Sequence, residues 1–365
     1  ESENLLFLGT EFGLYVTIDG GENWSKFENN MPATAVHFME LQKQTNDLVM
    51  GTHGRGVIII DDISPLRELS QEVLAQDVYF FKNKPFTMLE DSGFSGSFGT
   101  ETQFVGQSKS SAARIVYYLK KRHTFGKMKM EVFDMEGNKI TNLSPEKSKG
   151  INVITWGFNK NVPKMAQGKT LSFGGFTSPR VTAGNYKIVL TKGKNTYEQI
   201  IEVNYDENSI TSLAERKEQE ALTETLFNMV EDLAYMVYEI NGAMDKAKEV
   251  IKEDPKGKKK AQQAYNALST LLKELVVTTG DNYVASATPE LREKMGYLYS
   301  NIASTYDKVS GSNRDNFELI AEEFDTAKSK YQEIQNKEVK KFNTYIEKSG
   351  KEQTTLKSKK EFLEK

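Results

Sequence analysis

Short apolar runs separated by glycine and polar residues make up the N-terminal part of the chain. Runs of this length, flanked by turn residues, are typical of β-strands rather than helices. The runs are Leu5 to Leu8, Leu14 to Ile18, Val36 to Leu41, Leu48 to Met50 and Val57 to Ile60. The pattern therefore predicts all-β structure in this part of the chain.

Two stretches of this region resemble each other. Gly9 to Val16 reads Gly-Thr-Glu-Phe-Gly-Leu-Tyr-Val, and Gly51 to Ile58 reads Gly-Thr-His-Gly-Arg-Gly-Val-Ile, an offset of 42 residues (51 − 9) with one insertion. A repeat of about 40–45 residues has the length of a four-stranded β-propeller blade. One blade cannot bury its faces without neighbours. We therefore expect residues 1–66 to be the last one to two blades of a β-propeller, with further blades upstream.

Strand-like runs continue in a second region, from Ile115 to Val203, with different turn residues between them. They are Ile115 to Leu119, Met128 to Phe133, Ile151 to Trp156, Tyr186 to Leu190 and Tyr197 to Val203. Gly137-Asn138 and Gly193 to Asn195 predict hairpin turns, because glycine and asparagine tolerate positive φ. The spacing favours a β-sandwich over residues 101–206, preceded by a linker over 67–100.

The β pattern ends after Asp206, and apolar residues then recur in alternating steps of four and three, the seam of a long helix packed on others. One such series is Leu222, Leu226, Met229, Leu233, Met236, Ile240, Ala243 and Ala247, and another is Phe317, Ile320, Phe324, Ala327, Tyr331 and Ile334. A shorter helix is predicted near Lys260 to Val276, and Thr288-Pro289 is typical of a helix start. We expect an antiparallel helical bundle over 207–350 and a tail over 351–365.

Composition narrows the classes of function. The 365 residues include 48 basic and 51 acidic side chains, a formal net charge of −3, so nucleic acid is not an expected partner. Cysteine is absent, which excludes thiolate chemistry, disulfides and cysteine-ligated metal. With three histidines, widely separated, no metal site is expected, and no cofactor. No apolar run approaches the roughly 20 residues of a transmembrane helix.

A motif of high specificity lies at 17–24, which reads Thr-Ile-Asp-Gly-Gly-Glu-Asn-Trp. Thr17, Asp19, Gly21 and Trp24 fit Thr-x-Asp-x-Gly-x-x-Trp, in which the aspartate accepts backbone hydrogen bonds within a turn. This is the Asp-box of bacterial neuraminidase-type repeats, and the chain here resembles the large sortilin-like repeat proteins grouped with bacterial glycosyl hydrolases. The resemblance implies a structural role for Asp19.

A second group of residues is a candidate binding edge. Thr52, His53 and Arg55 lie in a glycine-rich turn, and Asp61 and Asp62 follow soon after. Histidine beside carboxylates permits a polar binding edge or an acid–base pair. The alternative is a plain blade turn in which Arg55 pairs with a carboxylate. Adjacent aspartates on a strand point to opposite faces, so the two do not by themselves form the carboxylate pair of a glycosidase.

The resemblance extends along the chain. Gly51 to Gly56 followed by Asp61 to Arg67 is similar to the signature that closes the last blade in that family. The sandwich is similar to a flagellar-hook-capping immunoglobulin-like domain, on Ile115 to Leu119, Gly150 to Trp156 and Gly184 to Tyr186, and the helical end matches through Leu291 to Tyr299. The expected fold class is therefore multidomain β + α: terminal β-propeller blades, an immunoglobulin-like β-sandwich and an antiparallel helical bundle.

We expect the chain to be a non-catalytic binding or scaffolding part of a bacterial protein. That protein is expected in the periplasm, on the outer surface or secreted, with a protein or a glycan as partner. A sialidase needs three clustered arginines, and the propeller part holds only Arg55 and Arg67. Two alternatives stay open. One is the accessory C-terminal end of a secreted glycoside hydrolase, and the other is a component of a secretion or surface-assembly complex.

Overall fold

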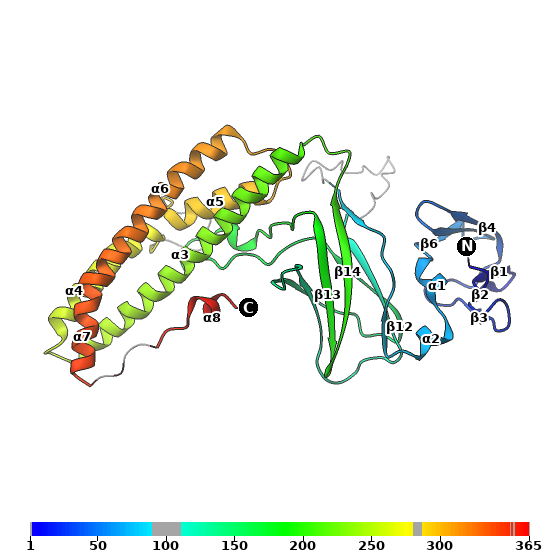
Figure 1. Ribbon diagram of the computed structural model, residues 1–365, viewed down its shortest axis with the longest axis horizontal. Helices are drawn as coiled ribbons and strands as arrows, with labels where there is room; N and C mark the ends of the chain where they lie inside the picture. The colour runs from blue at the N-terminus through cyan, green and yellow to red at the C-terminus, as the bar shows by residue number, and fades with distance from the viewer. Residues whose placement is uncertain (1, 90–110, 280–286, 351, 353–354, 365) are drawn as a thin grey trace. The chain divides into compact units, whose positions relative to one another are not determined.

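The computed structural model describes residues 2–89, 111–279, 287–350, 352 and 355–364. Contacts within the chain divide it into two compact units. Figure 1 shows the course of the chain through its helices and strands. The first unit comprises Glu1–Met88, Ser110–Phe158 and Ala183–Asn204, and the second comprises Leu89–Lys109, Asn159–Thr182 and Tyr205–Lys365. Strands dominate the first unit and helices the second, so the predicted β + α character is confirmed.

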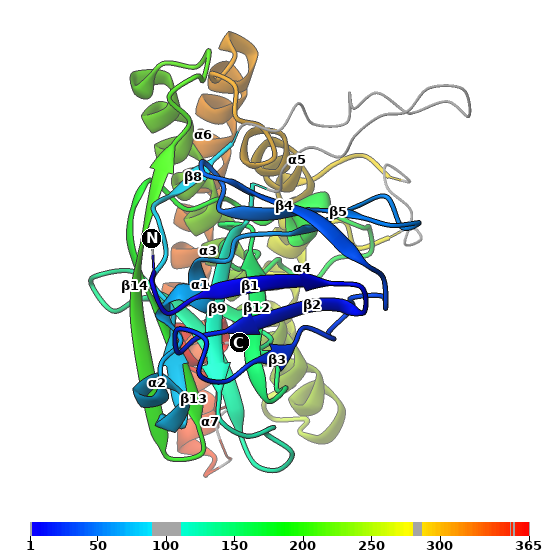
Figure 2. The same ribbon diagram turned by 90° about the vertical axis from the view of Figure 1, so that its right-hand side faces the viewer.

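The N-terminal part of the first unit forms two small antiparallel sheets, both visible in Figure 2. One contains β1 (Leu6–Thr10), β2 (Gly13–Thr17) and β3 (Ser25–Lys26), and the other contains β4 (Val36–Gln42), β5 (Asp47–Thr52) and β6 (Val57–Ile60). Leu14, Val36 and Met50 are buried in a core that the two sheets share. Every apolar run predicted as a strand here lies mainly in a strand.

The similar stretches of sequence both form hairpins. Gly9 to Val16 spans the turn between β1 and β2, and Gly51 to Ile58 spans the turn between β5 and β6. Each of the two sheets has three strands, so the predicted four-stranded blade is complete in neither. The residues that the structure describes form no closed propeller.

The rest of the first unit consists of a five-stranded and a three-stranded sheet, in the orders β11-β10-β13-β14-β8 and β12-β9-β7. The strands are β7 (Val78–Phe80), β8 (Phe86–Met88), β9 (Ala113–Leu119), β10 (Met128–Phe133), β11 (Lys139–Leu143), β12 (Gly150–Trp156), β13 (Gly184–Lys192) and β14 (Asn195–Tyr205). The buried rings of Trp156 and Tyr186 meet edge to face at 5.4 Å and join the two sheets. The predicted hairpin turns at Gly137 and Gly193 both have positive φ, 91° and 63°.

The predicted linker over 67–100 is wrong for its described part. Helix α1 (Ser64–Glu68) runs into it and α2 (Gln71–Ala75) follows. Strand β7 then joins the three-stranded sheet with β9, and β8 joins the five-stranded sheet. Edge strands of three residues carry too short a pattern to be recognised in sequence, because strand alternation needs four or more positions. Residues 90–100 of this prediction lie outside the described residues.

The second unit is built on α3 (Leu213–Glu253), which is 41 residues long. Helices α4 (Lys258–Leu275), α5 (Leu291–Ala303) and α6 (Gly311–Ile334) pack with it around one apolar core. A π-helical turn, η3 (Gln335–Val339), leads into α7 (Lys340–Lys348). The predicted seam is confirmed, since Leu226, Leu233 and Ile240 are almost fully buried. None of the described helices is long and apolar enough to span a membrane.

Helix starts differ from the predictions in detail. The start predicted at Thr288-Pro289 is wrong: α5 begins at Leu291, because Glu290 has extended backbone (φ −94°, ψ −175°). Ser212 caps α3 with a reciprocal Ser–Glu pair to Glu215, a signature that the sequence carries in plain view.

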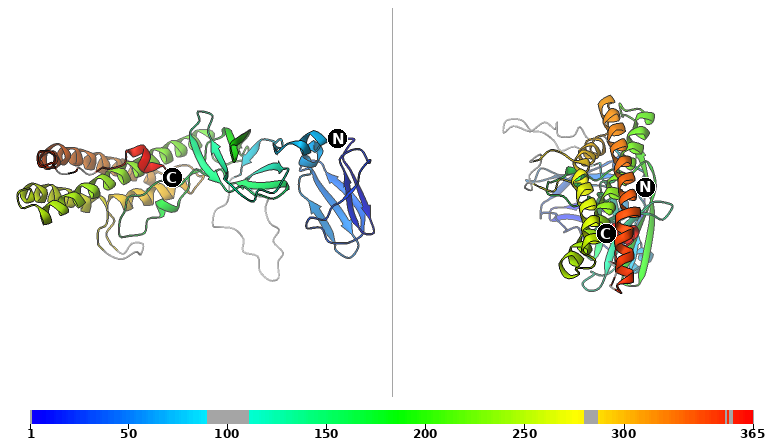
Figure 3. Two further views of the ribbon diagram at one scale, coloured as in Figure 1. Left: turned by 90° about the horizontal axis from the view of Figure 1, so that it is seen from below. Right: turned by 90° about the vertical axis from the view of Figure 1, so that its left-hand side faces the viewer.

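Two segments belong to the helical unit against expectation. Asn159–Thr182, which was placed in the sandwich, packs with the helices and contains the 3-10 helix η2 (Phe173–Phe176). Within the predicted tail, α8 (Lys359–Leu363) is capped by Ser358 and contacts α3, as Figure 3 shows for the red C-terminal helix.

The apolar core of the helical unit gives a direct test. Ile240→Ala removes a fully buried side chain from α3 and should lower the free energy of unfolding by about 2–5 kcal/mol, because a cavity remains. Leu319→Ala on α6 is the matched control, since Leu319 is 61% exposed, and should change it by less than about 0.5 kcal/mol. Urea denaturation followed by circular dichroism measures both. Equal effects would contradict the assigned core.

Candidate functional site

The Asp-box lies on the turn between β2 and β3. Thr17 Oγ1 donates to Asp19 Oδ1 at 2.6 Å and accepts from the backbone N–H of Gly21 at 3.1 Å. Asn23 donates twice to the Asp19 carboxylate, from its backbone N–H at 2.9 Å and from its side-chain amide at 2.8 Å. Gly21 has φ +104°, and the indole of Trp24 lies 3.9 Å from where its Cβ would be. The motif holds a turn.

Those hydrogen bonds fix the protonation state of Asp19. They lower the pKa of this carboxyl from 3.8 to about 2, chiefly through the Thr17 hydroxyl and next through the Asn23 backbone N–H. An acid this strong stays ionised at neutral pH, and both of its oxygens already accept hydrogen bonds. Asp19 is therefore unsuited to donate a proton to a substrate.

Thr52 is the last residue of β5, and His53 begins the turn to β6. The backbone N–H and the hydroxyl of Thr52 both donate to Gly56 O, at 3.0 and 2.7 Å. The backbone of His53 is held on both sides, because its N–H donates to Ala35 O at 3.0 Å and its carbonyl accepts from Thr34 Oγ1 at 2.9 Å. The imidazole of His53 is left exposed on a fixed backbone.

Two residues that sequence reasoning missed accompany His53. The rings of His37 and His53 lie 5.8 Å apart, and His37 Nε2 lies 3.5 Å from Glu11 Oε1. Glu11 stands 42 residues before His53 (53 − 11), the offset of the repeat, so comparison of the two repeats could have identified it. Glu11, His37 and His53 form an exposed polar cluster. No His, Asp and Glu side chains of the described residues are grouped so as to hold a metal ion.

The other candidate residues do not join this cluster. Asp61 and Asp62 follow the end of β6, whereas Thr52 and His53 precede its beginning. The expected placement of the aspartates on a strand is also wrong, since β6 ends at Ile60 and Asp62 has φ +46°. Arg55 has no carboxylate partner among the described residues, so the expected ion pair is not formed there.

Asp62 serves the local fold. Its backbone N–H donates to Asp47 Oδ1 at 2.9 Å, and its Oδ1 accepts from the N–H of Ser64, the first residue of α1, at 3.1 Å. Asn46, buried beside it, donates to Ser64 Oγ and accepts from Arg67 Nη1, each at 3.0 Å. This network attaches the β4–β5 turn to α1.

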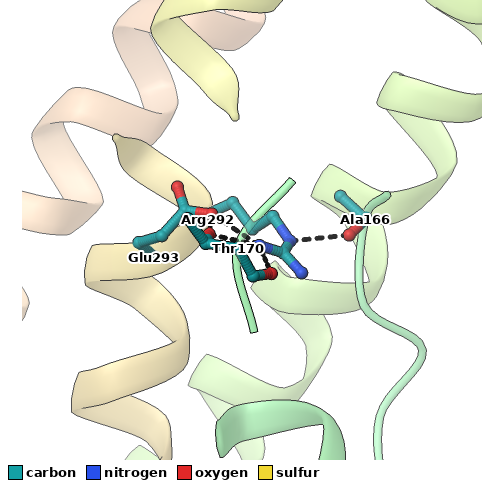
Figure 4. Close-up of polar contacts among 4 residues, drawn as sticks. All are labelled: Ala166, Thr170, Arg292 and Glu293. Carbon is teal, nitrogen blue, oxygen red and sulfur yellow. Dashed lines mark hydrogen bonds and ion pairs between the residues drawn. The ribbon is translucent and has the colours of Figure 1, made fainter. Parts of the chain in front are cut away.

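The most deeply buried charges of the described chain lie in the second unit. Arg292 and Glu293 on α5 are 6% and 4% exposed, and Figure 4 shows how they meet Ala166 and Thr170. Arg292 donates from Nε to Ala166 O at 2.7 Å and from Nη1 to Thr170 O at 3.1 Å and Glu293 Oε1 at 2.5 Å. Thr170 Oγ1 donates to the same carboxylate oxygen at 2.7 Å.

This cluster fixes Asn159–Thr182 against the helices. Gly168 allows the close approach, because a Cβ there would lie 2.8 Å from Arg292 Nη1. Farther along, a Cβ on Gly174 would lie 3.0 Å from the Cα of Gly296 on α5. Arg292 and Glu293 belong to the charged run Arg-Glu-Lys at the start of α5, and such a run is usually solvent-exposed, so nothing in the sequence marked them as buried. Their contacts are internal to the protein, which makes the cluster structural.

Comparison with protein-family models, with curated proteins and with solved structures gave no match to this chain. Its function is therefore argued from its own geometry.

The Asp-box predicts a pH dependence. Because the folded pKa of Asp19 is lowered, its contribution to stability is present above about pH 4 and is lost as the pH falls through about 2. Asp19→Asn should destabilise the protein at pH 7, and its difference from the wild type should shrink as the pH approaches 2. Urea denaturation followed by tryptophan fluorescence measures this. A difference that persists undiminished at pH 2 would refute the assignment.

The buried Arg292–Glu293 pair should contribute more to the free energy of unfolding than the exposed Lys294–Glu323 pair. Arg292→Ala leaves the Glu293 carboxylate buried without its cation and should cost about 3–5 kcal/mol of the free energy of unfolding. Lys294→Ala, in the next position, removes an exposed ion pair to Glu323 and should cost about 0–1 kcal/mol. Chemical denaturation compares the two. A similar cost for both would mean that Arg292 is accessible to water.

Proposed function

We propose that this chain is the C-terminal, non-catalytic binding and scaffolding part of a bacterial envelope or secreted β-propeller protein. In this proposal the chain consists of terminal propeller blades, an immunoglobulin-like sandwich and an antiparallel helical bundle. The observation that carries the propeller is an exchange of burial between equivalent positions of the 42-residue repeat. Leu8 is 48% exposed, while Met50, its equivalent, is fully buried. Leu14 is fully buried, while Val57, its equivalent, is 66% exposed.

This exchange of buried and exposed positions means that the two sheets pack head to tail, with unlike faces in contact. Leu14 and Met50 lie in the core between the two sheets, so the side of the first sheet that carries Leu14 faces the side of the second that carries Met50. The equivalents of these two residues, Val57 and Leu8, then lie on the sides that face away. A contact between unlike faces repeats into a ring or a stack, in contrast to a two-fold contact, which closes on itself. Each outer face carries exposed apolar side chains, Leu6 and Leu8 on the first sheet and Phe38, Val57 and Ile59 on the second.

Strand content supports the same reading. By the repeat, β1 and β2 are equivalent to β5 and β6. The first sheet adds β3 after this hairpin, and the second adds β4 before it. Together they define a repeating unit of four strands, the number in a propeller blade. Each sheet lacks one strand of that unit, at opposite ends.

A binding role is favoured over catalysis by how the candidate groups are used. Asp19 holds the Asp-box turn, and Asp62 holds the start of α1. Glu11 in the β1–β2 turn, His37 on β4 and His53 in the β5–β6 turn are exposed, and there they can contact a polar partner. A hydrolase would need two carboxyl groups across a cleft, and these two aspartates are committed elsewhere.

The outer face gives a test on the chain itself. Phe38, Val57 and Ile59 lie on the outward side of the second sheet and are each more than half exposed. The double substitution Phe38→Ser/Ile59→Ser should reduce both self-association in light scattering and binding of a hydrophobic dye. Phe125→Ser is the matched control, because Phe125 is 89% exposed in a loop and should change neither. Equal effects would count against a blade-like face.

The activity test uses the protein purified from its native source, with its ends defined by peptide mapping. A glycan-binding panel and a glycosidase panel are run on it. A second form lacks both the residues after Tyr205 and Asn159–Thr182, with Phe158 joined to Ala183, because these segments make up most of one compact unit. Turnover that survives this deletion would identify a hydrolase with an accessory end. Binding without turnover supports the proposal, and a protein partner lost with the deletion places the contact on the helices.

A further inference from the structure

The C-terminal segment Leu356–Leu363 lies on a surface of α3. The ring of Phe362 stacks on Tyr238 with centroids 4.7 Å apart and an interplanar angle of 24°, and it lies 5.6 Å from Tyr235. The Lys164 ammonium lies 3.9 Å from the centroid of the same ring. Phe362 is therefore bounded by two aromatic rings and a cation, an arrangement that favours an aromatic side chain.

Polar contacts set the register of the segment. Tyr235 donates its hydroxyl to Lys357 O, and the backbone N–H of Lys357 donates to the Tyr238 hydroxyl, each at 3.2 Å. Lys359 forms an ion pair with Asp232, and Lys164 Nζ donates to Phe362 O. The two tyrosines thus contact both the Phe362 side chain and the Lys357 backbone of the segment.

Gly242 completes the surface. It lies inside the long helix α3, where glycine is unfavourable. A Cβ at this position would lie 2.6 Å from Leu356 Cδ2 and 3.5 Å from its Cγ, so the glycine leaves room for the leucine. We call Lys164, Asp232, Tyr235, Tyr238 and Gly242 the α3 docking surface.

The two sides of this contact are unequal. The α3 docking surface stands on a 41-residue helix anchored in the core of the unit. The segment has less support, since α8 has five residues, none of them is fully buried, and Phe362 is its one side chain that packs against the core. Helices this short do not persist alone, although the Ser358–Glu361 capping box favours the turn. The surface exists without the segment, whereas the helix of the segment depends on the surface.

We propose that the α3 docking surface is a recognition site for this segment, and that it exchanges its own segment for that of a second copy of the chain. Every contact described above can form in the same way between two copies, because each joins the segment to α3 or to Lys164. Exchange of an identical element is a low-cost route to association. The partner is therefore a capped turn with a leucine, two lysines and a phenylalanine, supplied by another copy.

Because the chain has no cysteine, a disulfide can report the exchange. The acceptor is the full chain with Gly242→Cys and Phe362→Ala, which weakens its own docked segment. The donor is the full chain with Leu356→Cys. The 3.5 Å between the Gly242 Cβ position and Leu356 Cγ suits a disulfide between these positions. Equimolar acceptor and donor are oxidised and followed by non-reducing electrophoresis and peptide mapping.

We expect a heterodimer linked through positions 242 and 356. It should form about tenfold faster than with the matched control donor, Leu356→Cys/Phe362→Ala, because one well-packed aromatic anchor typically carries this much affinity. Circular dichroism establishes that all variants are folded. The double variant Gly242→Cys/Leu356→Cys in one chain reports docking within the copy.

Two results would overturn the proposal. If the one-chain variant closes its disulfide but acceptor and donor form no heterodimer, the segment is a permanent part of its own chain. If the heterodimer forms equally fast with the control donor, random collision and not recognition of Phe362 joins the chains.

Discussion

Leu14 of the first sheet and Met50 of the second are buried in one core, and the N-terminal part of the protein depends on that contact. It joins unlike faces of two similar sheets, so it satisfies one face of each and leaves the other open. Apolar side chains such as Leu8, Phe38 and Val57 lie on the open faces. Burial of such side chains is the main favourable term in folding, and further sheets on both sides would supply it.

The helical unit is held in a different way. Its core lies on one long helix, but its boundary is set by Arg292 and Glu293, which bind the distant segment around Ala166 and Thr170. Because buried charges must be paired, this segment cannot leave without a large cost. The unit is consequently discontinuous in sequence, and any truncation that separates Asn159–Thr182 from the helices removes part of its core.

Most of the candidate site residues stabilise turns. Asp19, Asp62 and Thr52 all accept or donate hydrogen bonds that close local structure. Glu11, His37 and His53 remain exposed on that rigid frame, and the α3 docking surface presents aromatic rings to a short helix. Both features suit recognition of a partner by fixed groups, which is what a binding or scaffolding role requires.

The sequence by itself determined the strands of the two small sheets, the hairpin turns at Gly137 and Gly193, the Asp-box turn and the long helix α3, because each depends on periodicity or turn chemistry within a few residues. Only the tertiary structure decided that β7 and β8 are edge strands of the sheets that contain β9 and β14, and that Asn159–Thr182 belongs with the helices. It also decided that Asp61 lies apart from His53 and that Arg292 and Glu293 are buried. These depend on contacts between residues distant in sequence, and local patterns of hydrophobic and polar residues do not encode which distant surface will cover a given face.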